Sequence, residues 1–176
     1  MAATDFDQVS AQLIHAYKDS GRSALAQQFA AAMVPLLPML PLPSTERATL
    51  VAVPSRVSSI QQRGYSPATL IASSLARQAR RQAGLDLAVD NNLVWRVKES
   101  ADQATLGVEA RHTNLRHTMQ ASARAKHRPV ILVDDIVTTG SSLFETARAL
   151  EVEGAKVLGF VTFSETILRN LAKTPT

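Results

Sequence analysis

The sequence contains no cysteine. This absence excludes disulfide bridges, a thiol nucleophile and zinc sites built on cysteine. It fits a reducing compartment, and we predict a cytoplasmic protein. The histidines, His15, His112, His117 and His127, do not show the H-x-x-x-H spacing of a metal-binding pair. No metal centre built on histidine or cysteine is therefore expected.

Long apolar runs are also missing. The most apolar stretch, residues 30–42, is interrupted by prolines and falls short of the ~20 residues that a membrane-spanning helix needs. Asp5 and Asp7 occupy the region where a signal peptide carries positive charge. We predict a soluble protein without a membrane span.

Aromatic residues make up only 5% of the chain, and few of them stand among the scattered arginines. A stacking platform for single-stranded nucleic acid is therefore not indicated. The 19 Lys and Arg against 15 Asp and Glu give a net charge of +4, which suits either a polyphosphate or a nucleic acid. Neither the P-loop pattern nor the G-x-G-x-x-G fingerprint occurs.

The 176 residues have the length of one domain. Apolar residues one helical turn apart predict a first helix, with Val9, Leu13 and Ala16 on its buried side, and a second one from residue 25 to 33. The later predicted segments are a strand over 49–53, a helix over 67–84, a strand over 93–97, a loop and helix over 103–115, a strand over 130–133, a helix over 142–154 and a strand over 157–163. This alternation predicts an α/β domain with a mostly parallel sheet. We expect a single domain over 1–176, with N-terminal helices over 1–45, a core over 46–165 and a partly disordered tail over 166–176.

The segment 130–142 reads Val-Ile-Leu-Val-Asp-Asp-Ile-Val-Thr-Thr-Gly-Ser-Ser. Its buried strand delivers Asp134 and Asp135 to a carboxyl end, where ligands bind in open α/β sheets. A run of small and hydroxyl residues follows and begins a helix, where N–H groups and the helix dipole suit a phosphate. Gly140 permits close backbone approach. Ser142 and Glu145 predict a capping box.

Two carboxylates beside a phosphate-binding loop would repel the phosphate if they faced it. Their position is explained if they face hydroxyl groups of the ligand instead. A ribose 5-phosphate meets both conditions, whereas an ordinary polar turn does not require two adjacent acids. The segment resembles the motif by which type I phosphoribosyltransferases bind 5-phosphoribosyl 1-diphosphate (PRPP). The resemblance implies that fold: a mostly parallel twisted sheet flanked by helices, with a mobile hood. It also implies 5-phosphate contacts from Thr138, Thr139, Gly140, Ser141 and Ser142.

Other stretches resemble the ComF family of this superfamily. They are Val51 to Arg56, Gln62 to Tyr65, Gln103 to Leu106 with Arg111 and Asn114, and Ala16 to Lys18 with Gly21 and Arg22. The four-cysteine zinc module found in many members of that family is absent. The family's Arg-Gly-Phe-Asn-Gln stretch appears here as Arg63 to Pro67. Purine salvage enzymes carry an aspartate at the position of Thr138, which argues against a hypoxanthine or guanine acceptor.

The resemblance assigns roles to particular residues. Pro54, Ser55 and Arg56 would form the pyrophosphate-binding turn, often with an unusual peptide geometry. The catalytic residues would be Asp134, Asp135 and Arg56, with Mg²⁺ as cofactor and the two aspartates as its indirect or weak ligands. Residues 96–114 would belong to the hood, and the candidate polar contacts of the closed state are Arg63, Gln103, Arg111 and Asn114.

The implied reaction displaces pyrophosphate from PRPP by a nitrogen acceptor. An alternative is a non-catalytic PRPP-sensing or DNA-uptake accessory protein, with single-stranded DNA or DNA-processing proteins as partners. A third interpretation is an α/β domain with an accidental motif. The sequence leaves open the acceptor, the role in competence and whether the chain forms a homo-oligomer.

Overall fold

The computed structural model describes residues 1–19, 21–97 and 117–166. The predicted loop and helix over 103–115, and the predicted tail from residue 167 on, lie outside these residues. The strands are β1 (Ala2–Asp5), β2 (Thr49–Ala52), β3 (Ala88–Val89), β4 (Val94–Arg96), β5 (Met119–Ala121), β6 (Pro129–Val137) and β7 (Lys156–Glu165). The α-helices are α1 (Gln8–Asp19), α2 (Leu25–Met33), α3 (Val57–Arg63), α4 (Pro67–Ala83) and α6 (Ser141–Val152). The 3₁₀ helices of the described residues are η1 (Val34–Met39) and η3 (Ala123–Ala125).

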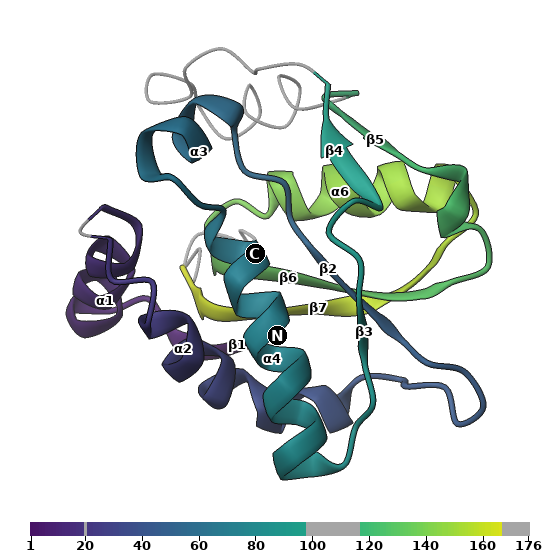
Figure 1. Ribbon diagram of the computed structural model, residues 1–176, viewed down its shortest axis with the longest axis horizontal. Helices are drawn as coiled ribbons and strands as arrows, with labels where there is room; N and C mark the ends of the chain where they lie inside the picture. Colours follow the sequence, from purple (N-terminus) through teal and green to yellow (C-terminus); the bar gives the residue numbers. More distant parts are fainter. Residues whose placement is uncertain (20, 98–116, 167–176) are drawn as a thin grey trace, which may run out of the picture.

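Five parallel strands form the main sheet in the order β1-β7-β6-β2-β3 (Figure 1). β4 and β5 form a separate antiparallel pair. The strand predicted over 93–97 is therefore present, but it lies outside the main sheet. The parallel sheet and its flanking helices confirm the predicted fold class.

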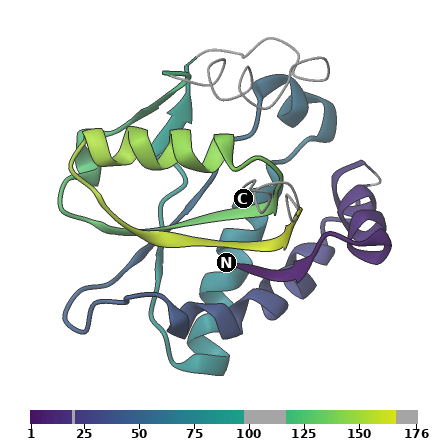
Figure 2. The ribbon, with the colours of Figure 1, turned by 180° about the vertical axis from the view of Figure 1, so that it is seen from behind.

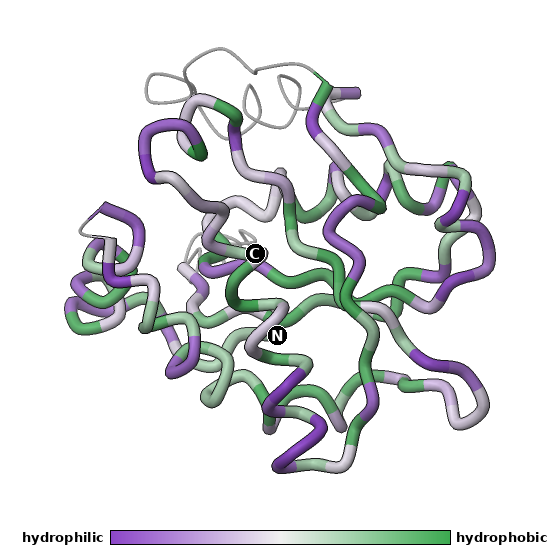
Figure 3. Tube along the Cα trace, in the orientation of Figure 1, coloured by the Kyte–Doolittle hydropathy of each residue, from purple (hydrophilic) through white to green (hydrophobic). Residues whose placement is uncertain are grey.

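Helices cover both faces of the sheet. α2 and α4 pack on one face and α6 on the other (Figures 1 and 2). Successive side chains of a strand point to opposite faces, so Ile131 lies in the core beneath α4 while Leu132 lies in the core beneath α6. This two-sided burial explains why residues 130–133 form an unbroken apolar run. Figure 3 shows the apolar residues gathered along the central strands.

The chain leaves the two central strands in opposite directions. From β2 it crosses through α3 and α4 to β3, whereas from β6 it crosses through α6 to β7 on the other side. The carboxyl ends of β2 and β6 therefore border a topological switch point, the place where open α/β sheets bind ligands.

The N-terminal region differs from the prediction in two ways. The strand β1 was not predicted, and it extends the sheet beside β7. In α1 the buried residues are Ser10, Ile14 and Tyr17, while Val9 is 64% exposed. The predicted face is one residue out of register because the helix buries a serine: the Ser10 hydroxyl bonds to the backbone around Asp7, and the Asp7 carboxylate accepts the Ser10 N–H at 2.7 Å.

Within the described residues, none of the helices combines the length and the apolar character that crossing a membrane requires.

Candidate functional site

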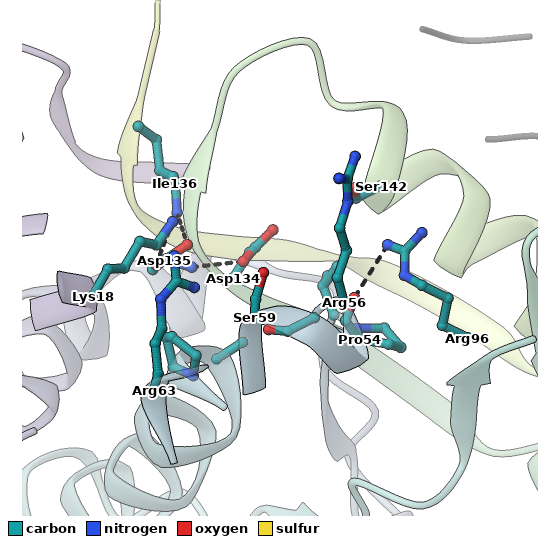
Figure 4. Close-up of a pocket in the computed structure, with 14 residues that line it drawn as sticks. Lys18, Pro54, Arg56, Ser59, Arg63, Arg96, Asp134, Asp135, Ile136 and Ser142 are labelled. Atoms are coloured by element: carbon teal, nitrogen blue, oxygen red, sulfur yellow. Dashed lines mark hydrogen bonds and ion pairs between the residues drawn. The ribbon is translucent and has the colours of Figure 1, made fainter. Parts of the chain in front are cut away.

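An open cleft of about 270 Å³ lies at the switch point, between the segments that follow β2 and β6. Figure 4 shows its charged and polar side chains, which come from α1, the β2–α3 turn, α3, β4, the end of β6 and the start of α6. The cations that line it are Lys18, Arg56, Arg63 and Arg96, and the acids are Asp134 and Asp135. This excess of positive charge suits an anionic ligand.

The two adjacent acids have different surroundings. Asp134 is half-buried and lines both the cleft and a smaller cavity formed by the loop after β6. Asp135 points to the opposite face of the strand and is only 3% exposed. Its Oδ2 lies 2.8 Å from Lys18 Nζ, and its Oδ1 accepts the Ile136 N–H at 2.9 Å. Asp134 is therefore the acid that opens toward both cavities.

Burial raises the pKa of Asp134 well above its usual value, and the negative charge of Asp135 raises it further. Lys18 acts in the opposite direction and lowers the pKa of Asp134. A partly buried carboxylate beside a buried one is costly to ionise. A ligand that donates hydrogen bonds to Asp134 therefore compensates for a negative charge that is unfavourable in the free protein.

The turn after β2 supplies the other side of the cleft. The Val53 N–H donates to Val133 O at 2.9 Å, which holds the end of β2 against β6. Arg56 is the N-terminal cap residue of α3, and the Arg96 guanidinium donates to Pro54 O at 3.3 Å. Every peptide bond among the described residues is trans, so the unusual peptide geometry expected here is not found.

The loop Thr138–Ser142 surrounds the smaller cavity. Gly140 adopts the left-handed conformation, with φ 73°, and is the N-terminal cap residue of α6. Two hydroxyls bond to each other at 2.8 Å, those of Thr139 and Ser141. The loop thus places a helix N-terminus and hydroxyl groups around a space open to an anion.

The predicted capping box is wrong. The cap residue of α6 is Gly140, and Ser142 lies inside the first turn without a cap bond. Glu145 instead receives hydrogen bonds from Arg148 at 2.8 Å and from the Met119 N–H at 3.3 Å. Burial alone would raise the pKa of Glu145, but these bonds outweigh it and lower the pKa. Glu145 therefore ties α6 to β5 rather than capping its own helix.

Residues 55–173 match the family model of the phosphoribosyl transferase domain. The chain belongs to the phosphoribosyl transferase domain family. DNA utilization protein YhgH of Escherichia coli (strain K12) is 29% identical over 162 residues, which cover 88% of this chain and 66% of that protein. Competence protein F of Haemophilus influenzae is 35% identical over 98 residues, which cover 54% of this chain and 40% of that protein. These relatives confirm the resemblance to the ComF family, and the chain spans about two thirds of the length of YhgH.

Solved structures give a further comparison. A hypoxanthine phosphoribosyltransferase of Staphylococcus aureus has a TM-score of 0.43 and 14% identity, covering 88% of this chain and 70% of that chain. The protein TT1426 of Thermus thermophilus has a TM-score of 0.44 and 17% identity, covering 84% of this chain and 86% of that chain.

The phosphoribosyl transferase domain brings most of the predicted site residues together. Ser55, Arg56, Asp134 and Ser142 border one cleft, and the remaining residues of the 138–142 loop adjoin it. Arg63 also lines the cleft, at the end of α3, where its guanidinium lies 3.5 Å from Asp19. The other three predicted hood contacts, Gln103, Arg111 and Asn114, lie outside the described residues.

Lys18 and Ser59 also line the cleft, and the sequence did not single them out. Ser59 follows Arg56 by one helical turn in α3, so a predicted helix at 57–63 would have indicated it. For Lys18 the resemblance to the ComF family marked the segment, but no pattern in the sequence pointed to a role. Arg96 was assigned to the hood, and its side chain reaches the cleft.

The side chains that line the cleft are compatible with a magnesium ion that is bound mainly by the phosphates of a ligand. Among the described residues, no group of three or more His, Cys, Asp or Glu side chains could hold a metal ion alone. Magnesium usually combines one or two carboxylates with water and substrate phosphates. Asp134, with a carboxylate open to the cleft, fits that pattern.

Proposed function

We propose that this protein binds PRPP together with Mg²⁺ and transfers its phosphoribosyl group to a nitrogen acceptor, with release of pyrophosphate. The observation that carries this proposal is the position of Asp134, which lines both the cleft and the cavity of the 138–142 loop. A ligand with a phosphate in the loop can therefore present sugar hydroxyls to this carboxylate.

The remaining parts of PRPP follow from that placement. The 5-phosphate would lie against the N–H groups of the loop and the hydroxyls near Gly140. The pyrophosphate would extend along the cleft toward Ser55 and Arg56, at the other side of the switch point. The net positive lining favours such a polyanion despite the two carboxylates.

In the proposed reaction, the bond between the anomeric carbon and pyrophosphate oxygen breaks as the carbon–nitrogen bond forms, and the nitrogen loses a proton to solvent or to the departing pyrophosphate. Bound Mg²⁺ would neutralise charge on the pyrophosphate oxygens as they depart. The carboxylate of Asp134 would stabilise the positive charge that develops on the ribosyl ring. Arg56, beside the turn, would orient the leaving group.

A second candidate function is PRPP sensing or DNA-uptake assistance without transfer. The names of the relatives, DNA utilization protein and Competence protein F, favour it. So does the chemistry of the cleft, because its described lining contains no histidine, and one of its two acids is engaged by Lys18.

Pyrophosphate release separates the two functions. The full chain would be incubated with PRPP, Mg²⁺ and a panel of amines, amides and nucleobases, with an Asp134→Asn, Asp135→Asn double variant as the control. Release that requires both an acceptor and the intact acids supports transfer. PRPP binding without release from any acceptor contradicts transfer, and salt-sensitive binding of single-stranded DNA would then support the accessory role.

A further inference from the structure

The helix α1 precedes the segment that matches the family model, which begins at residue 55. It nevertheless reaches the cleft through one side chain. Lys18, in the last turn of α1, lines the cleft, and its Nζ lies 2.8 Å from Asp135 Oδ2 (Figure 4). A residue from outside the matched segment thus contacts one of the two acids of the proposed PRPP site.

Asp135 is buried, so the loss of its contact with Lys18 would leave a buried charge without a partner. The side chain of Asp135 is 4% exposed and that of Lys18 is 23% exposed. One Asp135 oxygen is satisfied by the Ile136 N–H, and the other makes no hydrogen bond to a described residue apart from the ion pair with Lys18. Removing one partner of a buried ion pair leaves the other charge uncompensated, which is strongly unfavourable. Lys18 therefore supplies the positive charge that faces this carboxylate and contacts its Oδ2.

The backbone around Lys18 is fixed to the wall of the cleft. The Tyr17 ring is fully buried, and its hydroxyl donates to Pro67 O at 2.8 Å. The Tyr65 hydroxyl in turn donates to Tyr17 O. Pro67 begins α4 and lines the cleft itself. The end of α1 is thus hydrogen-bonded to the segment between α3 and α4 and to the start of α4. These bonds fix the backbone position of Lys18.

We propose that Lys18 is a positioning residue of the PRPP site and acts through Asp135. The alternation of side chains along β6 places the Asp135 carboxylate on the face away from the 138–142 loop, and Lys18 fixes the position of its Oδ2 there and balances its charge. A polyphosphate then meets one uncompensated acid, Asp134, instead of two. This inference rests on the proposed binding of PRPP, and it makes α1 part of the site.

The experiment measures the dissociation constant of PRPP with Mg²⁺ for the full chain by calorimetry. The variants are Lys18→Met, Lys18→Arg, Asp135→Asn and the double variant that combines Lys18→Met with Asp135→Asn. Lys156→Met is the matched control, because Lys156 is exposed at the start of β7, whereas the cleft lies at the carboxyl ends of the strands. Thermal unfolding establishes that each variant is folded.

Lys18→Met should weaken PRPP binding by about tenfold or more, because the cleft then contains a buried carboxylate whose charge is not balanced. Lys18→Arg, which retains the charge, should restore binding to within about threefold of wild type. In the Asp135→Asn background, Lys18→Met should have no further effect beyond about twofold. If Lys18→Met alone does not fold, the comparison in the Asp135→Asn background and the Lys18→Arg variant still decide the question.

Two results would overturn the inference alone: equal weakening by Lys18→Met in the wild-type and Asp135→Asn backgrounds, or no weakening in either. The first would mean that Lys18 contacts the ligand itself. A folded wild-type protein that does not bind PRPP would instead overturn the proposed function, and this inference with it.

Discussion

The loop Thr138–Ser142 and the acid pair Asp134–Asp135 are neighbours in sequence, but they are organised differently. The loop is ordered by contacts within itself: the left-handed Gly140 and the bond between the Thr139 and Ser141 hydroxyls. The acid pair depends on a distant segment, because Lys18 of α1 balances the buried Asp135. One half of the site is thus local, whereas the other half requires the assembled fold.

This difference predicts how mutations in each half of the site change ligand binding and folding stability. Damage to the loop should remain confined to phosphate binding, with a modest effect on stability. Changes in the acid pair should alter ligand binding and folding stability together, since buried charges contribute to both.

The largest effect is expected from Asp134→Asn. Loss of the charged acceptor should weaken PRPP binding by about 100-fold, since a hydrogen bond to a charged group contributes about 1.5–3 kcal/mol. Calorimetric titration measures this change. Undiminished binding by the variant would show that Asp134 does not contact the ligand.

The same variant should be more stable than wild type at neutral pH. The pKa of Asp134 is raised in the folded protein, mainly by burial. Because the folded protein favours protonated Asp134, this group contributes stability that is fully present below its pKa in the unfolded chain. That contribution is lost as the pH rises through its pKa in the folded protein. The melting temperature of Asp134→Asn, relative to that of wild type, should therefore rise as the pH is raised from about 4, the ordinary pKa of an aspartate, to neutrality. A constant difference across this range would contradict the raised pKa.

Gly140→Ala should have the next largest effect. A left-handed conformation costs a non-glycine residue about 1–2 kcal/mol, and the added Cβ would lie 2.9 Å from the Phe144 ring. We expect a loss of PRPP affinity of about tenfold. The control is Gly84→Ala, which has φ 66° but open space around it, at the end of α4. It should lose similar stability and retain binding, and equal losses of binding in both variants would refute a local effect.

Ser141→Ala tests the internal bond of the loop. Without its hydroxyl, the Thr139 side chain loses its partner, and a single neutral hydrogen bond contributes about 0.5–1.5 kcal/mol. PRPP binding should weaken by a few-fold, with Ser122→Ala at the start of η3 as a control that leaves it unchanged. A loss as large as that of Asp134→Asn would mean that Ser141 has a larger role than ordering the loop.

The smallest effect is expected at a surface ion pair. Arg47 and Asp86 lie 3.0 Å apart, and both side chains are more than half exposed. Arg47→Met should change the free energy of unfolding by less than about 1 kcal/mol and leave PRPP binding intact. Chemical denaturation measures this value. A loss of PRPP binding equal to that of Lys18→Met would remove the distinction between buried and exposed pairs.

The difference between local and distant organisation also explains what the sequence could predict. Residues 130–142 are contiguous, so the apolar strand, the two acids and the loop follow from one segment, as does the α/β fold from the alternation around it. The partner of Asp135 could not be predicted, because Lys18 lies on an N-terminal helix whose contact depends on Tyr17 and Pro67.

Two local errors have the same origin. Ser142 and Glu145 have capping-box spacing, but the left-handed Gly140 is the N-terminal cap residue of α6. Glu145 accepts hydrogen bonds from Arg148 and from the backbone of β5 instead. The face of α1 was misassigned because Ser10 is buried through hydrogen bonds to the segment before the helix. In each case particular hydrogen bonds or a backbone conformation outweighed a sequence pattern.

The most direct test of PRPP binding at the switch point is a calorimetric titration of the full chain with PRPP, with and without Mg²⁺. Wild type would be compared with the Asp134→Asn, Asp135→Asn double variant. We predict binding by wild type that is strengthened by Mg²⁺ and lost in the folded double variant. Folded wild-type protein that does not bind PRPP, or a double variant that binds equally well, would contradict the account.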